Sequence, residues 1–276
     1  MTHPVLTTGR VAVVTGAAMG IGLAACRRFA ALGMRVCMAD VLADELQAAR
    51  GEVARLAPGG ERDVIAVPTD VARADEVEAL KEAVWAAFGG VGLLMNNAAT
   101  RVGGGALARL EDWHNALNVN FWGVVHGVQA FAPRMIEQGI PGFVINTGSK
   151  QGITNPPGNL AYNVTKSALK TFTEGLQHEL RNIPGCRISA HLLVPGWTTT
   201  GTREHKPGAW LPDQVIDLML AALGRGDFYI LCPDDEVTPE MDKKRILWSA
   251  GDITENRPPL SRWHPDYAKA FTEFSA

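Results

Sequence analysis

The sequence predicts an α/β protein built on a doubly wound, parallel, seven-stranded sheet. Short apolar runs rich in β-branched residues alternate with helix-like segments along the chain. Strands that alternate with helices in this way pair into a parallel sheet. A glycine-rich turn, GAAMGIG from Gly16 to Gly22, joins the first strand to the first helix. Since no internal repeat or linker divides the 276 residues, we expect a single domain over 1–276.

Composition narrows the class of protein. Hydrophobic residues make up 46% and charged residues 20% of the chain, as in ordinary soluble globular proteins. The net charge of -3 gives no electrostatic reason to expect a nucleic acid or a membrane surface as partner. The N-terminus lacks an apolar signal core, and no run of apolar residues is long enough to span a membrane. We therefore expect a cytoplasmic protein.

The four cysteines are scattered, without a Cys-x-x-Cys pair. We expect reduced, mostly buried thiols rather than disulfides or metal ligands. The histidines His114 and His126 have no second ligand at metal spacing, so we expect packing or surface roles for them and no metal site.

Seven strands and six helices are expected in chain order. The strands cover 10–15, 34–39, 64–71, 92–99, 141–149, 186–196 and 227–232. The first helix follows Gly22, and the others cover 42–56, 74–89, 111–138, 162–182 and 213–224. Pro133 is expected to kink the helix 111–138 or to end its regular part. The glycine-rich segment 100–110 is expected to form a mobile loop.

The turn after the first strand has the features of a phosphate site. Gly16 permits a tight turn, and Gly20 and Gly22 remove side chains where a backbone must approach a phosphate or a strand. The following helix offers free N–H groups and the positive end of its dipole to a pyrophosphate. A plain strand-to-helix turn is the alternative interpretation.

Asp40 ends the second strand, eighteen residues after Gly22. A carboxylate at this place can accept both hydroxyls of an adenosine ribose, and it would repel a 2′-phosphate. No arginine follows Asp40, and Met19 stands where a basic residue could have met a phosphate. We therefore expect NAD as cofactor in preference to NADP.

Other strand ends supply further candidates at the same edge of the sheet. Asp70 and Val71 are candidate adenine contacts, and Asn97 is placed for the cofactor ribose. Asn96 is expected to bridge neighbouring strands, which is a structural role. In doubly wound sheets ligands bind outside the carboxyl ends of the strands, so these residues should meet in one crevice.

Tyr162 and Lys166 stand four residues apart, with Ser149 thirteen residues before the tyrosine. On a helix this spacing places the two side chains on one face. A lysine ammonium there can stabilise a tyrosine phenolate and lower its pKa, which makes the phenol a usable proton donor and acceptor. Alone, Tyr-x-x-x-Lys is a weak motif. Its position after the fifth strand favours the interpretation that the pair is catalytic.

With these residues in place, the chain resembles the short-chain dehydrogenase/reductase family, in its branch of about 250 residues, over residues 8–232. TGAAMGIG is similar to the family's cofactor motif, and NNAA to its NNAG motif, with Ala99 in place of the usual glycine. Asn120 in NVNFWG, Ser149, Tyr162 with Lys166, and the Pro195-Gly196 turn match the family's remaining motifs.

The resemblance implies a Rossmann-like fold, an NAD-dependent oxidation of a secondary alcohol or reduction of a ketone, and four catalytic residues. Tyr162 would exchange a proton with the substrate oxygen, and Ser149 would hydrogen-bond that oxygen. Lys166 would bind the nicotinamide ribose and lower the pKa of Tyr162, and Asn120 would hold a water that links Lys166 to solvent. The expected cofactor contacts are Gly16, Ala18, Met19, Gly20, Ile21, Gly22, Asp40, Asp70, Val71, Asn97, Ala98, Tyr162, Lys166, Pro195, Gly196 and Thr198.

Two segments depart from the usual pattern of the family. A C-terminal extension, 233–276, contains several prolines and aromatic residues, and we expect it to pack either on its own subunit or on a neighbour. Residues 197–212 are the expected substrate lid. Trp197 and Trp210 in this lid would favour a bulky or aromatic substrate, and core packing explains them equally well. Lys150 and Gln151, beside Ser149, are candidates to face the substrate.

Two other functions share parts of this pattern. An epimerase or dehydratase would have the same fold and Tyr-x-x-x-Lys, but such enzymes tend to have TGxxGxxG spacing and a longer chain. A non-catalytic NAD-binding sensor or scaffold would lose Ser149, Tyr162 or Lys166, and all three are present. Apolar residues on the helices 111–138 and 162–182 further suggest a homodimer or homotetramer, because members of the family commonly pair these helices.

Overall fold

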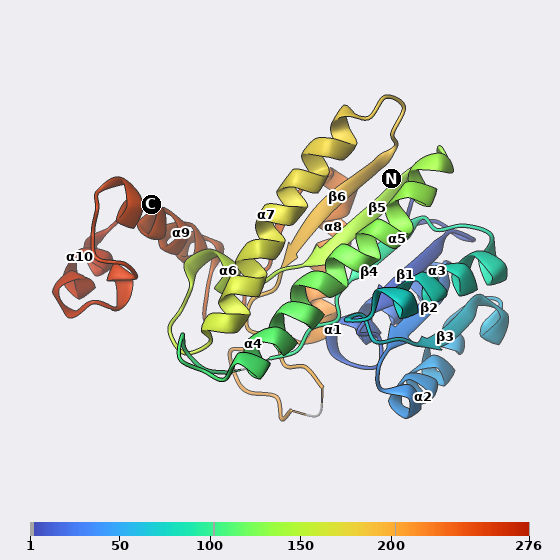
Figure 1. Ribbon diagram of the computed structural model, residues 1–276, viewed down its shortest axis with the longest axis horizontal. Helices are drawn as coiled ribbons and strands as arrows, with labels where there is room; N and C mark the ends of the chain where they lie inside the picture. Colours follow the sequence, from blue (N-terminus) through green and yellow to red (C-terminus); the bar gives the residue numbers. More distant parts are fainter. Residues whose placement is uncertain (1–2, 102, 202, 276) are drawn as a thin grey trace.

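The computed structural model describes residues 3–101, 103–201 and 203–275, which form a parallel sheet of seven strands with helices on both faces (Figure 1). The strand order is β3-β2-β1-β4-β5-β6-β7. This order confirms the predicted doubly wound α/β fold. The direction of winding changes between β1 and β4, and a crevice opens at such a switch point.

The strands are close to those predicted, but most of them end earlier. They are β1 (Val11–Thr15), β2 (Arg35–Asp40), β3 (Val64–Pro68), β4 (Leu93–Asn96), β5 (Gly142–Thr147), β6 (Ile188–Val194) and β7 (Tyr229–Leu231). Asp70, Asn97, Ser149 and Pro195 therefore lie just beyond their strands, in the loops at the carboxyl edge.

Helices cover both faces of the sheet, and the last two belong to the C-terminal extension beyond it (Figure 1). They are α1 (Gly20–Ala31), α2 (Ala43–Ala54), α3 (Ala74–Phe88), α4 (Leu110–Leu117), α5 (Gly123–Glu137), α6 (Gln151–Thr154), α7 (Leu160–Asn182), α8 (Pro212–Arg225), α9 (Pro239–Thr254) and α10 (Ala268–Glu273). One-turn 3₁₀ helices lie at η1 (Gly60–Asp63), η3 (Ser261–Trp263) and η4 (Pro265–Tyr267).

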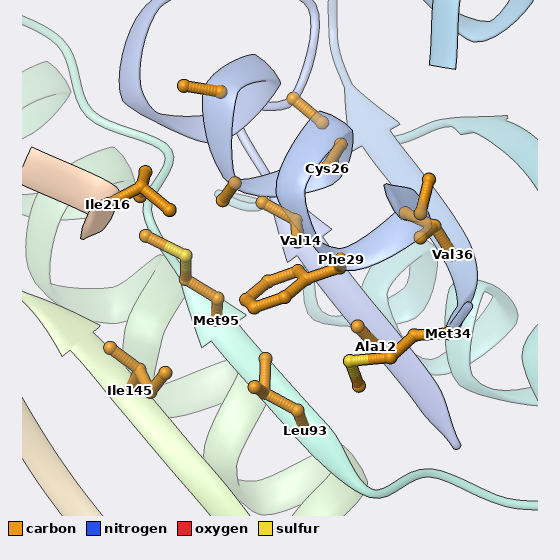
Figure 2. Packing of buried hydrophobic residues seen from close by; sticks show 14 of the residues in the cluster. Ala12, Val14, Cys26, Phe29, Met34, Val36, Leu93, Met95, Ile145 and Ile216 are labelled. Atoms are coloured by element: carbon orange, nitrogen blue, oxygen red, sulfur yellow. The ribbon is translucent and has the colours of Figure 1, made fainter. Parts of the chain in front are cut away.

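Two hydrophobic clusters hold these layers together. One joins α1, α2 and α8 to one face of the sheet, and in it Phe29 of α1 lies among Val14, Leu93 and Met95 of the strands (Figure 2). The other joins α3, α5 and α7 to the opposite face. Successive residues of a strand point to opposite faces. Because both faces of this sheet are covered, its central strands are mainly apolar, and their buried polar residues lie at the carboxyl ends, as at Thr15, Asn96 and Asn146.

The predicted helix 111–138 is interrupted, but not at Pro133. A π-helical turn, η2 (Asn118–Trp122), separates α4 from α5, and α5 continues through Pro133 to Glu137. Single π turns inside helices are rare and occur often at functional sites. Here the turn contains Asn120, one of the expected catalytic residues.

The apolar side chains that suggested pairing of subunits are largely used within the chain. Val125, Val128 and Phe131 of α5 and Leu169 and Leu180 of α7 are buried in the second cluster. Phe172 and Leu176 of α7 are only partly buried, and Leu160 and Val164 are exposed at its start. An oligomer remains a prediction that rests on the resemblance to the family.

The C-terminal extension is folded and projects from one end of the molecule beside α6 (Figure 1). Trp248 of α9 is its core, with an exposed fraction of only 3%. Its indole Nε1 donates a hydrogen bond to Ser261 Oγ at 2.8 Å, and Phe271 and Phe274 contact its ring edge-on. Arg257 lies over the same ring, 3.9 Å from its centroid. The extension therefore packs on itself and joins the main body at α6.

Asn96 bridges two strands as predicted. Its Nδ2 donates to Oδ1 of Asn146 on β5 at 2.9 Å, and Asn146 Nδ2 donates to Thr173 Oγ1 on α7 at 3.1 Å. All three side chains are buried. This chain of hydrogen bonds ties β4, β5 and α7 together behind the carboxyl edge of the sheet.

We predict that Asn96→Ala lowers the free energy of unfolding by about 1–3 kcal/mol, because the buried Asn146 Oδ1 loses its partner. Urea unfolding measures this change. Gln47→Ala, which removes an exposed amide on α2, serves as control and should change stability by at most about 0.5 kcal/mol. Equal stability of the Asn96 variant and the wild type would contradict the bridging role.

Candidate active site

A cleft of about 720 Å³ opens at the carboxyl edge of the sheet. Its walls are the turn after β1, the loops that follow β2 to β6, the first turns of α7, and the residues Thr198, Thr200, Gly201 and Arg203. The structure brings most of the predicted site residues to this cleft. Those that line it are Gly16, Met19, Gly20, Ile21, Asp40, Asp70, Val71, Asn97, Ala98, Ser149, Tyr162, Lys166, Pro195, Gly196 and Thr198. Ala18, Gly22 and Asn120 lie behind its walls.

Two positions of the glycine turn have room only for glycine. Gly16 has a positive φ of 65°, and a Cβ on it would lie 2.8 Å from the Ala98 Cα. A Cβ on Gly22 would lie 2.1 Å from the Gly16 carbonyl oxygen, so α1 starts directly against the turn. Met19, the N-cap residue, makes no side-chain capping hydrogen bond. The first N–H groups of α1 are thus available to an anionic group in the cleft.

Asp40 is held in a fixed orientation at the end of β2. Its Oδ2 accepts a hydrogen bond from Ala18 N at 2.9 Å, and its Oδ1 accepts one from Leu42 N at 3.1 Å. Each carboxylate oxygen keeps capacity for a further donor, which suits ribose hydroxyls. The neighbouring wall residues Met19, Val41 and Leu42 carry no charge. This end of the cleft therefore offers carboxylate oxygens to hydroxyl donors, and these three neighbours add no positive charge to it.

Asn97 lines the cleft just beyond the end of β4 and is held there by hydrogen bonds to β1 and β5. Its backbone N–H donates to Thr15 Oγ1 at 3.0 Å, and its Nδ2 donates to the Thr15 carbonyl at 3.1 Å. Thr147 Oγ1 donates to Asn97 Oδ1 at 3.3 Å. The ends of β1, β4 and β5 are cross-linked at this residue.

Lys166 is the most deeply buried charged group of the cleft, with an exposed fraction of 2%. Its Nζ donates to the Thr147 carbonyl at 2.6 Å and lies 5.7 Å from the Tyr162 ring centroid. Burial lowers the pKa of Lys166 to about 7, and the positive charge of Arg101 acts in the same direction. The amine is therefore only partly charged at neutral pH.

Tyr162 lies beside Lys166 on α7, as the spacing predicts. Burial raises the pKa of its phenol, while the charge of Arg101 and hydrogen bonds with Ser149 and Arg101 lower it. Lys166, whose Nζ lies 5.7 Å from the ring centroid, is the group expected to lower this pKa, and that role stays a prediction.

Asn120 has a structural contact that explains its burial. Its Oδ1 accepts from Thr100 N at 2.7 Å, and its Nδ2 donates to the Thr100 carbonyl at 2.9 Å. The same Nδ2 lies 3.3 Å from Thr165 Oγ1. The π turn thus fixes the backbone of the loop immediately before Arg101.

Sequence reasoning missed Arg101 and Arg203, both of which line the cleft. Arg101 lies in the segment 100–110 that was expected to be a mobile loop. Its position four residues after Asn97, just beyond the end of β4, was the signal that could have found it, because residues that follow a strand end line this edge. Arg203 lies within the expected lid.

Neither Lys150 nor Gln151 is among the residues that line the cleft. The prediction that Lys150 faces the substrate is wrong, and that for Gln151 stays a prediction. Lys150 Nζ instead lies 2.7 Å from Asp242 Oδ2 and 3.5 Å from Asp234 Oδ2, both in the C-terminal extension. Lys150 is the N-cap residue of the short helix α6, which starts at Gln151.

The histidines take structural or surface positions. His126 Nδ1 lies 3.0 Å from the Val71 carbonyl, and His114 is exposed. Across the described residues no group of three or more His, Cys, Asp or Glu side chains could hold a metal ion. Cys26, Cys37 and Cys232 are buried free thiols, and Cys186 is half-buried. None of the described helices is long and apolar enough to cross a membrane.

Comparison with known proteins decides the family. The sequence profile described as short chain dehydrogenase matches residues 10–208. The chain is 31% identical over 249 residues to 1-deoxy-11-beta-hydroxypentalenate dehydrogenase of Streptomyces avermitilis, a match that covers 86% of this chain and 89% of that protein. The chain belongs to the short-chain dehydrogenase/reductase family. The resemblance inferred from the motifs is thereby confirmed.

Solved structures of the family agree with this fold. A short-chain dehydrogenase/reductase from Burkholderia phymatum in complex with NAD has a TM-score of 0.82 and 33% identity, covering 91% of this chain and 96% of that one. A metagenomic short-chain oxidoreductase in complex with NADP has a TM-score of 0.69 and 30% identity, covering 82% and 98%. As a member of the family, the chain is an oxidoreductase that acts on CH–OH groups with a nicotinamide cofactor.

We predict that Arg101→Met raises the pKa of the Tyr162 phenol, because it removes the positive charge and the hydrogen bond that lower that pKa. The ultraviolet absorbance of tyrosinate measures it. The chain has only three tyrosines, so subtraction of the Tyr162→Phe titration isolates the signal. Arg101→Lys, which keeps the charge, should shift the pKa less.

Arg203→Met is the matched control, because Arg203 lines the same cleft but is not among the causes of the Tyr162 shift. Its titration should equal that of the wild type. A Tyr162 titration that does not change in Arg101→Met would show that Arg101 does not act on the phenol.

Proposed function

We propose that this member of the short-chain dehydrogenase/reductase family interconverts a secondary alcohol and a ketone with NAD as cofactor. The observation that carries the proposal is the meeting of Ser149, Tyr162 and Lys166 in the same cleft as the glycine turn and Asp40. A proton-transfer group and a dinucleotide site are thus parts of one cavity, which a sensor or scaffold would not require.

Tyr162 is the proposed acid and base. In alcohol oxidation its phenolate takes the hydroxyl proton, and in ketone reduction its phenol returns a proton to the carbonyl oxygen. Ser149 hydrogen-bonds the same oxygen and holds it in place. A bound nicotinamide supplies the hydride chemistry. The protein side chains bind and orient the substrate and transfer the proton.

Lys166 and Asn120 support this proton transfer. We assign Lys166 to the nicotinamide ribose, and its pKa of about 7 lets it gain and lose a proton near neutral pH. Asn120 lies behind the wall and holds the Thr100 backbone at 2.7 and 2.9 Å. Its proposed role is to hold a water that links Lys166 to solvent.

NAD is preferred to NADP because of the charge at the adenosine end. Asp40 would repel a 2′-phosphate, and Met19, Val41 and Leu42 offer it no positive partner. The other residues assigned to the cofactor are Gly16, Ala18, Gly20, Ile21, Gly22, Asp70, Val71, Asn97, Ala98, Pro195, Gly196 and Thr198. Relatives bind either NAD or NADP, so the preference rests on this carboxylate.

The proposed substrate is a small-molecule alcohol or ketone. The name of the Streptomyces avermitilis relative describes a dehydrogenase of a hydroxy compound, in agreement with this class. The proposed lid, about residues 197–212, is closed at its base by a hydrogen bond from Trp210 N to the Trp197 carbonyl at 2.8 Å. Neither tryptophan is among the described residues that line the cleft. A preference for bulky or aromatic substrates therefore requires that the lid moves and brings one of these tryptophans to the cleft.

Further proposals concern the organisation of the chain. We assign residues 1–276 to one domain, with its core over 8–232 and the extension over 233–276. We also propose a homodimer or homotetramer, as in other members of the family. The folding of the extension on Trp248 supports its assignment as a separate structural addition to the core.

The purified protein should form NADH from NAD and secondary alcohols, and Tyr162→Phe should lower kcat by about 10²–10⁴-fold because it removes the acid–base group. The absorbance of NADH measures the rate. Binding of NADH should persist in the variant, since the phenol oxygen contributes little to holding the dinucleotide. Full activity of Tyr162→Phe, or no turnover of any alcohol by a wild type that binds NAD, would contradict the proposal.

Asp40→Ala should lower the ratio of kcat/KM for NAD to kcat/KM for NADP. The substitution removes the repulsion of the 2′-phosphate together with the acceptor for the ribose hydroxyls. Asp40→Asn is the matched comparison: it removes the charge and keeps a hydrogen-bond acceptor. The two variants thus separate repulsion from hydrogen bonding. An unchanged ratio in both would show that Asp40 does not contact the ribose.

A further inference from the structure

We propose that Lys150, Asp234 and Asp242 form a buried charge centre that positions Ser149 and the segment 195–198. Through this centre the C-terminal extension supports the geometry of the active site. The inference rests on the proposed function, because it assigns positioning residues to that same site. These three side chains line no part of the cleft and act from behind its wall.

The centre is a compact group of one cation and two carboxylates. Lys150 Nζ lies 2.7 Å from Asp242 Oδ2 and 3.5 Å from Asp234 Oδ2. The exposed fractions of the side chains are 15% for Lys150, 3% for Asp234 and 6% for Asp242. Charged side chains are rarely buried this far unless they are paired. The three residues come from separate parts of the chain, namely the loop after β5, the start of the extension and α9.

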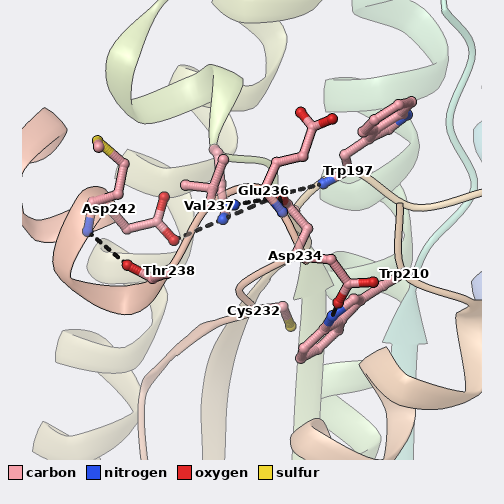
Figure 3. A network of polar contacts seen from close by, with 12 residues as sticks. Trp197, Trp210, Cys232, Asp234, Glu236, Val237, Thr238 and Asp242 are labelled. Carbon is pink, nitrogen blue, oxygen red and sulfur yellow. Dashed lines mark hydrogen bonds and ion pairs between the residues drawn. The ribbon is translucent and has the colours of Figure 1, made fainter. Parts of the chain in front are cut away.

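Asp234 connects this centre to the segment after β6. Its Oδ2 accepts a hydrogen bond from Trp197 N at 2.9 Å, and its Oδ1 accepts from Val237 N at 2.8 Å and Glu236 N at 3.1 Å (Figure 3). A Cβ on Gly196 would lie 2.6 Å from Asp234 Oδ2. Asp234 is therefore packed directly against the Pro195-Gly196 turn, which lines the cleft.

The next residue of the extension holds the base of the lid. Trp210 Nε1 donates to Asp235 Oδ1 at 3.0 Å, and Asp235 N donates to the Gly208 carbonyl at 3.1 Å. Figure 3 shows Trp197 and Trp210 on either side of the chain at Asp234. Both ends of the proposed lid thus depend on the first residues of the extension.

Lys150 connects the centre to the catalytic serine. It is the residue after Ser149, and the chain beyond it packs closely on α7: a Cβ on Gly152 would lie 2.4 Å from the Lys166 carbonyl carbon. Ser167 Oγ donates to the Gly152 carbonyl at 2.9 Å. The segment 149–152 is therefore clamped between α7 on one side and the extension on the other.

The charge balance indicates what each substitution would do. Without Lys150, the two buried carboxylates would lose the cation between them. The charge of Arg245, which also acts on Asp242, would be left to oppose their repulsion, and the extension would be pushed away from the 195–198 segment. Burial raises the pKa of Asp242, and Lys150 opposes that rise. Without the charge of Asp242, Lys150 still pairs with Asp234. Substitution of Asp242 should therefore disturb the 195–198 segment less than substitution of Lys150. Lys150→Arg keeps the charge and should restore much of the function.

Hydrogen exchange of the full-length protein tests the positioning without any substrate. Lys150→Met and Asp242→Asn should speed exchange in peptides that cover 149–154 and 195–199, although neither residue bonds to the backbone of 195–199. Lys150→Arg should exchange more slowly than Lys150→Met. Asp266→Asn is the control, because Asp266 is an acid of the same extension with 82% of its side chain exposed. Exchange that increases only within α9 would overturn the proposal.

Kinetics with the best secondary alcohol provide the second readout. A displacement of the serine and of the nicotinamide wall should lower kcat by up to about 10²-fold in Lys150→Met, with a smaller loss in Asp242→Asn. The dissociation constant of ADP-ribose, which lacks the nicotinamide, should stay within about twofold because its site is distant. This binding also shows that each variant is folded.

The outcomes separate the two proposals. A wild type that oxidises no alcohol overturns the proposed function, while faster exchange at 149–154 and 195–199 would still support the charge centre. An active wild type whose Lys150→Met variant keeps both its kcat and its exchange pattern overturns the charge centre alone.

Discussion

The burial of Lys166 is the constraint on which the rest of the site depends. An amine enclosed by protein needs an acceptor, and the Thr147 carbonyl provides it at 2.6 Å. This contact fixes α7 against the end of β5, and the approach of Gly152 to the Lys166 backbone adds a second fixed point. Tyr162, one turn earlier on α7, is thereby held beside Ser149. The low pKa of Lys166 follows from the same burial.

The carboxyl edge of the sheet gathers the remaining groups by geometry alone. Parallel strands end at one edge, so the loops after them converge there. Hydrogen bonds at Asn97 and Asn146 cross-link these loops and strands. Charge then divides the cleft: carboxylates, Asp40 and Asp70, lie at the ends of β2 and β3, while the cationic Arg101 and Lys166 flank Tyr162. The first residues of the C-terminal extension complete the opposite wall from behind.

Much of this arrangement could be predicted from local patterns. Strand–turn–helix alternation and the glycine spacing predicted the fold, and the i, i+4 spacing predicted the Tyr162–Lys166 pair. The π turn around Asn120 could not be predicted, because helical periodicity continues through it, and Pro133 was a misleading signal. The direction of Lys150 and the effect of Arg101 on Tyr162 depend on long-range contacts, with residues ninety-two and sixty-one positions away. No local pattern contains such information.

In the proposed reaction, hydride passes directly between the carbinol carbon of a secondary alcohol and the nicotinamide while Tyr162 takes the hydroxyl proton. Incubation with NAD and an alcohol that carries deuterium on the carbinol carbon tests it, with mass spectrometry of the NADH produced. We expect one deuterium on the nicotinamide ring in the wild type and almost no product in Tyr162→Phe. NADH without deuterium, or equal product from both proteins, would contradict it.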